Sequence, residues 1–164
     1  MEILDVNFFR NKFLSVVDEL RAALGYAVRD SDPEFGNELV MEMMYGNFDF
    51  SVVHSQRFCA HNILIECDFG DVPENNKSEI IERLLQMNVA LAEHDGSVFC
   101  LDDSATKLTY ALPMHLKALN GNVLLSKMTE IVWHGRRWLE TRFLLEDRQT
   151  PNTVLNPIFS ASLS

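Results

Sequence analysis

The chain has 164 residues, of which 47% are hydrophobic and 23% charged, and this composition is typical of one folded domain and excludes a disordered chain. Its net charge is −10, from 24 acidic and 14 basic residues. Phosphate binding requires clustered lysine and arginine, so the acidic charge argues against a nucleic-acid partner and against binding to an anionic membrane surface. A domain of this size has a large surface relative to its volume, so a homodimer that buries part of this surface is one possibility.

The number of cysteines and the N-terminal sequence indicate the cellular compartment in which the protein is found. Cys59, Cys67 and Cys100 form an odd and sparse set, which implies no disulfide framework and favours a reducing environment. The opening MEILDVNFFRNKF lacks the basic and apolar regions of a secretory signal, and no apolar run is long enough to span a membrane. We therefore expect a cytoplasmic protein without membrane insertion.

The first half of the chain predicts one helix and three strands. Apolar residues recur at helical spacing over about residues 6–24, and Gly25 suits the end of that helix. The segments ELVMEMMY, DFSVVHS and FCAHNILIECDF are typical of strands, and Gly46-Asn47 between the first two indicates a hairpin turn. Alternation places these side chains on shared faces, strand by strand: Leu39, Met41, Met43 and Tyr45; Phe48, Phe50 and Val52; Ile63, Ile65, Cys67 and Phe69.

The second half predicts a helix, a second hairpin and a last helix. Asn76 followed by Glu79 indicates a capping box for a helix over about residues 77–92. The strands SVFCLD and KLTYALP follow, and then a helix over about residues 119–145, which Gly135 is expected to weaken or bend. The order α-β-β-β-α-β-β-α predicts an α+β domain with an antiparallel twisted sheet packed against helices.

A change in composition marks the end of this domain. We expect residues 1–146 to form the folded domain. Residues 147–164, DRQTPNTVLNPIFSASLS, contain two prolines and many Ser, Thr and Asn residues, so we expect a flexible tail.

Metal binding is the first chemistry to weigh. Cys59, His61 and Cys67 point to one side of the expected third strand. Two cysteines eight residues apart on one strand lie roughly 26 Å apart, from a rise of about 3.3 Å per residue. They cannot share an ion without a sharp bend, so we predict no metal and no cofactor.

Nucleophilic catalysis is the second kind of chemistry that the sequence could suggest. Cys100 with His94 or His115 is an imaginable nucleophile and base, but nothing in the sequence brings these residues together, and no nucleophile motif is present. The paired Asp102 and Asp103 lie in a turn, where aspartate is favoured for backbone reasons. We therefore predict no enzyme and no catalytic residue, and keep a small Cys- or His-dependent enzyme as an alternative.

The helix that begins near Ser78 carries more apolar residues than one narrow stripe can hold. These residues are Ile80, Ile81, Leu84, Leu85, Val89 and Leu91. One side of such a helix can pack on its own sheet while the other packs on a second copy of the protein.

With these elements in place, the chain resembles the class I type III secretion chaperones of the Tir chaperone (CesT-like) family. The resemblance covers about residues 6–143, and its most telling part is SEIIERLLQMNVALAEHDGSVFCLDD, with Leu84-Leu85, Asn88 and the turn at Gly96. The segment YALPM and a last helix carrying Trp138 also fit. The resemblance implies a homodimer that binds the N-terminal segment of a secreted effector and keeps it soluble and competent for secretion, without ATP.

The resemblance also implies two sets of site residues. The dimer interface expected from it comprises Ile81, Leu84, Leu85, Asn88 and Val98. The effector-binding groove expected from it is lined by Phe9, Phe13, Leu39, Met41, Met43, Phe50 and Val52.

Three departures from the family pattern leave an alternative open. The tail after Asp147 extends past the usual end of the domain, the loop over residues 29–37 lacks a short Asp-Gly lead, and Gly135 interrupts the last helix. A chaperone-like dimeric adaptor or regulatory protein without a secreted client is therefore the second hypothesis.

Overall fold

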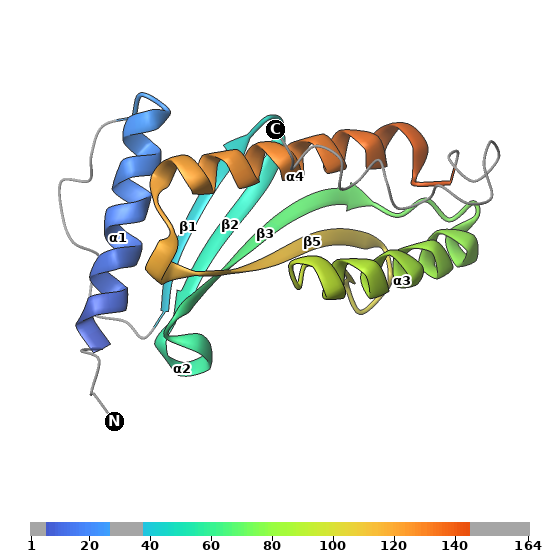
Figure 1. Cartoon of the computed structure of the whole chain (residues 1–164). Coiled ribbons are helices and arrows are strands. Elements are labelled where there is room, and N and C mark those ends of the chain that lie inside the picture. The colour runs from blue at the N-terminus through green and yellow to red at the C-terminus, as the bar shows by residue number, and fades with distance from the viewer. Residues whose placement is uncertain (1–5, 27–37, 145–164) are drawn as a thin grey trace.

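The structure, a computed structural model, describes residues 6–26 and 38–144, apart from the side chains of residues 6, 58 and 59 (Figure 1). The expectations for the loop over residues 29–37 and for the tail lie outside this part of the chain. The described elements are α1 (Val6–Ala23), β1 (Glu38–Tyr45), β2 (Phe48–Ser55), α2 (Gln56–Cys59), β3 (Asn62–Asp71), α3 (Lys77–His94), β4 (Val98–Leu101), β5 (Lys107–His115), the 3₁₀ turn η1 (Leu116–Ala118) and α4 (Gly121–Thr141). The predicted α+β class and the order of its main elements are confirmed, and α2 and η1 are additions.

The five strands form one antiparallel sheet in the order β1-β2-β3-β5-β4. Both predicted hairpins are present, β1 with β2 and β4 with β5. The first turns at Gly46 and Asn47, whose φ angles of 60° and 71° are those of the two-residue type I′ turn that suits twisted strands. The turn sets the register, in which Tyr45 lies opposite Phe48.

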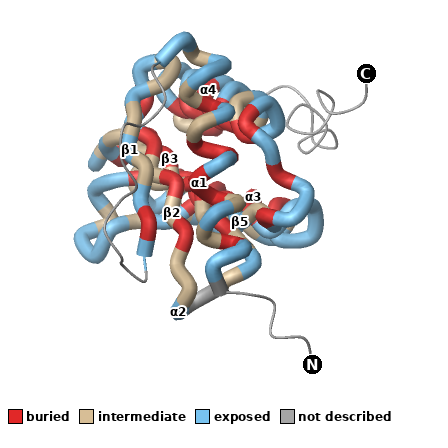
Figure 2. The backbone as a smooth tube through the Cα atoms, turned by 90° about the vertical axis from the view of Figure 1, so that its left-hand side faces the viewer, coloured by how far each residue is buried: buried red, intermediate tan, exposed pale blue. Residues whose placement is uncertain are grey.

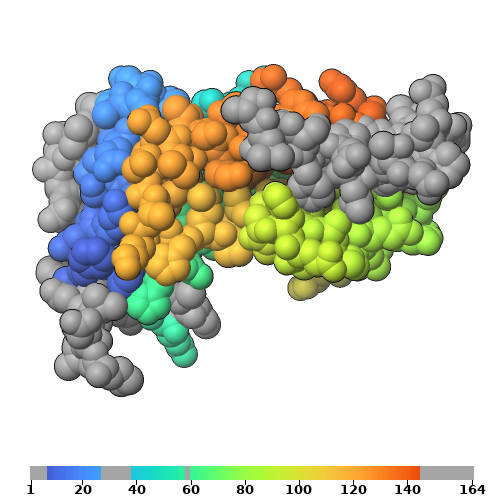
Figure 3. Space-filling view, viewed as in Figure 1, coloured from blue at the N-terminus to red at the C-terminus, as the bar shows by residue number. Residues whose placement is uncertain are grey.

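The three long helices lie on one side of this sheet, so the molecule has two layers (Figures 1 and 3). Buried residues gather between the layers, as the side view shows (Figure 2). The strands alternate accordingly: Phe48, Phe50 and Val52 of β2 are buried under the helices, whereas Asp49, Ser51 and Val53 point to the other side and are exposed or half-buried. We call this other side the helix-free face.

Gly135 allows α4 to lie directly on the sheet. A Cβ atom at this position would lie 2.6 Å from ring carbons of Phe48, so no larger residue fits without displacing that buried ring. α4 runs as a single helix through this point and ends where Arg142 and Phe143 take positive φ angles. Gly135 therefore serves close packing between helix and strand, which sequence periodicity alone does not reveal.

The third strand begins later than predicted. The strand was expected to begin at Phe58, but residues 56–59 form α2, residues 60 and 61 connect it to β3, and β3 starts at Asn62. The reason is topological, because the chain must reverse between two antiparallel neighbours and uses residues 56–61 to do so. The buried His54 ring holds the turn through a 3.0 Å hydrogen bond between its Nε2 atom and the Ala60 carbonyl oxygen.

The predicted capping box is also wrong. Asn76 has a φ of 65°, its side chain makes no capping hydrogen bond, and its carbonyl oxygen instead accepts the Ile80 N–H at 2.9 Å. At the start of α4 a side-chain cap does form, since Asn120 Oδ1 accepts the Val123 N–H at 2.9 Å.

An aromatic cluster joins the two layers. Phe69 of β3 contacts Phe48, Phe99 and Tyr110, with ring centroids 5.8 to 6.1 Å apart. Trp138 of α4 is fully buried and reaches this cluster through Phe143. Its neighbour Leu139 is 53% exposed. No helix within the described residues has both the length and the apolarity that a membrane span requires.

Candidate functional site

β1 lies at one edge of the sheet. β1 is paired with β2 on one side, and no strand within residues 6–26 and 38–144 pairs with its other side. Two large apolar side chains project from it, Val40, 52% exposed, and Met44, 66% exposed. An unpaired strand of eight residues with exposed apolar side chains is a template to which a further strand can add.

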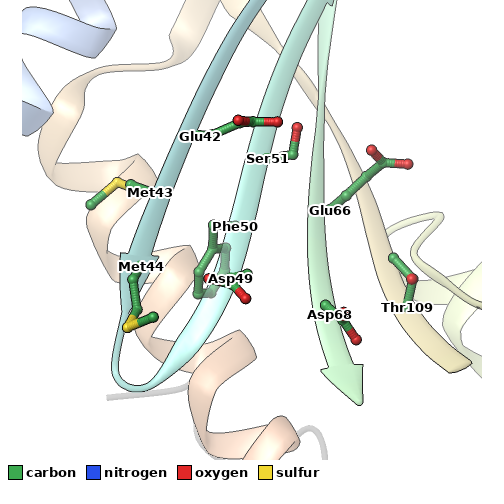
Figure 4. Close-up of a pocket in the computed structure, with 9 residues that line it drawn as sticks. All are labelled: Glu42, Met43, Met44, Asp49, Phe50, Ser51, Glu66, Asp68 and Thr109. Carbon is green, nitrogen blue, oxygen red and sulfur yellow. The ribbon is translucent and has the colours of Figure 1, made fainter. Parts of the chain in front are cut away.

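Next to this edge, the helix-free face is hollowed into an acidic depression of about 560 Å³. Figure 4 shows it from the helix-free side, with α4 behind the sheet and Glu42, Ser51 and Glu66 projecting from β1, β2 and β3. These three residues form one cross-strand row, because Glu42 lies opposite Ser51 and Ser51 opposite Glu66. The residues that line the depression are Glu42, Met43, Met44, Asp49, Phe50, Ser51, Glu66, Asp68 and Thr109.

A second depression of about 420 Å³ on this face is mainly apolar. Its centre is a cross-strand row in which Val53 lies opposite Leu64 and Leu64 opposite Pro113, and Val40 of β1 continues the row. The residues that line it are Glu38, Val53, Ser55, Asn62, Ile63, Leu64 and Pro113. The face therefore carries an apolar row beside an acidic one, an arrangement that can hold an extended chain but contains no reactive pair of groups.

The predicted groove residues lie mostly in the core. Phe13 is only 2% exposed and stacks on His54, with ring centroids 5.6 Å apart. Phe9, Leu39, Phe50 and Val52 are similarly buried, whereas Met41 and Met43 of β1 are half-buried. The cause is the packing of the helix layer on the sheet, which buries Phe9 and Phe13 of α1 together with the residues of β1 and β2 that face the helices. Their role in binding a client stays a prediction.

The predicted interface residues divide between the two sides of α3. Leu84 is buried against the core, whereas Leu85 is 62% exposed and Val89, one turn further on, is 66% exposed. Ile81 and Val98 are half-buried. The exposed stripe on α3 is available to a second copy, and its role as an interface stays a prediction.

Asn88 has a role within the subunit. Its Oδ1 atom accepts the Phe99 N–H at 2.7 Å, and its Nδ2 atom donates to the Phe99 carbonyl oxygen at 3.0 Å. The amide thus pairs with the β4 backbone as a neighbouring strand does. It fastens α3 to the edge of the sheet opposite β1.

No metal centre is formed by the described residues, which contain no group of three or more His, Cys, Asp and Glu side chains suited to hold an ion. Cys67 is buried in the sheet, and burial raises the pKa of its thiol. His61 packs against Phe9 and His115, with ring centroids 4.5 and 6.3 Å apart. The Cys59 side chain lies outside the described residues.

Cys100, the candidate nucleophile, lies in surroundings that do not activate its thiol. Although Cys100 is an exposed residue, partial desolvation of its thiol and, to a smaller extent, the Glu66 carboxylate raise the pKa of that thiol, which disfavours the reactive thiolate. Cys100 pairs with Thr109, six residues along β5 from His115, which is roughly 20 Å at about 3.3 Å per residue. Burial lowers the pKa of His134, which stacks on Tyr110, to about 4.

Val40, Glu42 and Met44 form the accessible side of β1, and the sequence analysis did not select them. Their alternation with Leu39, Met41 and Met43 was visible in ELVMEMMY. What the sequence lacks is the information that β1 is an outer strand and that the helices cover only one face.

The fold is shared with type III secretion chaperones of known structure. The chain is similar to a chain of the ExsC–ExsE complex, with 14% identity, a TM-score of 0.58, and coverage of 84% of this chain and 94% of that one. For the Yersinia pestis type III secretion chaperone SycH, solved with a stable fragment of YscM2, the identity is 13%, the TM-score 0.58, and the coverage 76% and 98%. For the HopA1–SchA chaperone–effector complex these values are 14%, 0.58, 85% and 99%.

Sequence comparison identifies the family. Residues 48–139, more than half of the chain, match the Tir chaperone protein (CesT) family. The chain therefore belongs to this family, as the resemblance in the sequence predicted. Among curated proteins, no sequence matches it significantly.

Proposed function

We propose that this protein is a class I type III secretion chaperone that binds the N-terminal chaperone-binding segment of an effector in the bacterial cytoplasm. The observation that carries the proposal is the open edge of β1 in a member of a chaperone family. One solved structure with the same fold is a chaperone–effector complex. The bound segment is kept soluble and competent for secretion.

The binding mode follows from the exposed backbone. An extended effector segment adds to β1 through main-chain hydrogen bonds, and its alternate side chains contact the two sides of the strand. Val40 and Met44 are available on the helix-free side, and Met41 and Met43 on the other. Binding energy alone holds the segment extended, so neither ATP nor a catalytic group takes part, and the protein is not an enzyme.

The chaperone acts as a homodimer in this proposal. The exposed stripe on α3, with Leu85 and Val89, is one turn long and apolar, and it lies on the side of the helix that faces away from its own core. A two-fold contact lets the same stripe serve both subunits. The β1 edges of both subunits then stay open for the client.

The test is retention of an effector by the full-length protein. The tagged chain is purified from cells that produce effectors, and each co-purifying secreted protein is then remade with and without its N-terminal segment. We expect retention to depend on that segment. Recovery of only the self-associated protein from such cells would instead favour the adaptor or regulatory protein.

A further inference from the structure

The backbone groups that face the open edge belong to a definite set of β1 residues. A two-residue type I′ turn closes on a hydrogen-bonded pair, here Tyr45 and Phe48. Inward and outward positions alternate along an antiparallel strand, so Met44, Glu42 and Val40 direct their N–H and C=O groups outward. The same three residues place their side chains on the helix-free face.

The charges around these three residues are of one sign. Glu42 lies between Val40 and Met44 along the strand, and Glu66 lies in the same cross-strand row. Asp49 and Asp68 form the next row with Met44. Among the nine residues that line the acidic depression, four are carboxylates and none is basic.

We propose that the segment that pairs with β1 carries a lysine or arginine beside Glu42, flanked two positions away on each side by apolar residues over Val40 and Met44. This inference rests on the proposed function and adds the chemistry of the client. Opposite charges on directly neighbouring strands attract, and apolar cross-strand pairs bury surface on either side of them. Period-two alternation makes the pattern the same for parallel and antiparallel addition.

A second copy of the chain fits this edge less well. Pairing of two β1 strands brings another Glu38 and Glu42 to an edge that already carries both, beside a second acidic depression. Like charges on adjacent strands are destabilising, so the edge discourages self-pairing and leaves room for a basic strand.

The probes are three synthetic peptides, Thr-Leu-Val-X-Ile-Leu-Thr, in which X is Lys, Gln or Glu. Each is titrated to millimolar concentration into the isotopically labelled full-length protein, and affinity is measured from the amide signals of Val40, Glu42 and Met44. For the wild-type protein we expect the Lys peptide to bind about tenfold more tightly than the Glu peptide at low salt, with the Gln peptide between them. Added salt should narrow this difference, because the charges are exposed.

Reversing the charge of Glu42 tests whether this residue causes the preference for the Lys peptide. In Glu42→Lys the order of the three peptides should invert, so that the Glu peptide binds best. Glu140→Lys is the matched control, since Glu140 is exposed on α4 and the change in net charge is the same. This control should keep the wild-type order. Because Glu42 is itself exposed, neither variant is expected to unfold the protein.

Three results would overturn the inference. Equal affinity for the Lys and Glu peptides would remove the charge preference. An identical order in wild type and Glu42→Lys would assign the preference to the overall charge. Signal changes confined to β2 and β3, or none with any peptide, would show that β1 does not accept a strand of this pattern. The chaperone function is decided separately, because effector retention does not depend on which peptide binds.

Discussion

The two edge strands of the sheet differ in whether their outer backbone groups have hydrogen-bond partners in the part of the chain that the structure describes. At one end β4 has only four residues, and the Asn88 amide occupies both backbone groups of Phe99. At the other end β1 has eight residues and no strand partner on its outer side within the described chain. Soluble proteins usually cover, shorten or charge their edge strands to prevent association. Here one edge is covered, and the other carries acidic residues between exposed apolar ones.

This difference separates two kinds of contact. The α3 helix that closes the β4 edge also presents the exposed apolar stripe, which we propose as the contact with a second copy. The β1 edge has no strand partner within the described residues, and we propose it as the site for a client that is later released. Variants at the two ends should therefore affect different properties.

Leu85→Asp should have the largest effect. The leucine is 62% exposed in the single chain, so the change leaves the core intact, but at a two-fold contact it buries two unpaired carboxylates. We expect the dimer to weaken by about 3 to 5 kcal/mol while each monomer stays folded. Analytical ultracentrifugation measures the first property and circular dichroism the second.

Leu139→Asp is the control for this change, since Leu139 is a similarly exposed leucine on α4. It should leave the dimer unchanged. If Leu85→Asp also remains a dimer, the stripe on α3 is not the interface.

Asn88→Leu should destabilise the covered edge. The substitution keeps the size of the side chain but leaves the N–H and C=O groups of Phe99 without their partner. An unsatisfied, partly buried backbone group is costly, and we expect the free energy of unfolding to fall by about 2 kcal/mol. Urea denaturation at a fixed protein concentration measures it, with Asn122→Leu at an exposed position of α4 as the control. Equal effects of the two changes would contradict the role of Asn88.

Local signals in the sequence predicted most of the elements. Gly46-Asn47 specified its hairpin because the turn needs two positive φ angles, which these residues adopt readily. The predicted capping box at Asn76 was wrong, because asparagine also tolerates positive φ angles and here adopts a left-handed conformation without a capping hydrogen bond. Residues 58–61 were predicted wrongly as the start of the third strand, because the reversal between β2 and β3 overrides strand propensity there.

The site was harder to predict, because it depends on strand order. Sequence alternation separates Phe50 from Asp49 but does not say which of them faces the helices. That β5 lies between β3 and β4, and that β1 is therefore an outer strand, follows only from pairing between distant segments. The groove residues were selected for apolarity, and apolar residues such as Phe13 of α1 and Phe50 of β2 are the ones buried between the helices and the sheet.

Val40→Pro should have the smallest effect on stability and a selective effect on binding. The Val40 N–H points away from β2, so proline removes no bond of the β1–β2 ladder, and its ring occupies the path of an added strand. We expect the free energy of unfolding to change by less than about 1 kcal/mol and the affinity for a retained effector segment to fall about tenfold. Calorimetric titration with that segment measures the affinity. Val40→Thr changes the polarity of the side chain but keeps the N–H, so it should bind the segment better than the proline variant does. Wild-type affinity in Val40→Pro would show that the client binds elsewhere on the molecule, and the β1 edge would then lose its role as the binding site even if the protein is a chaperone.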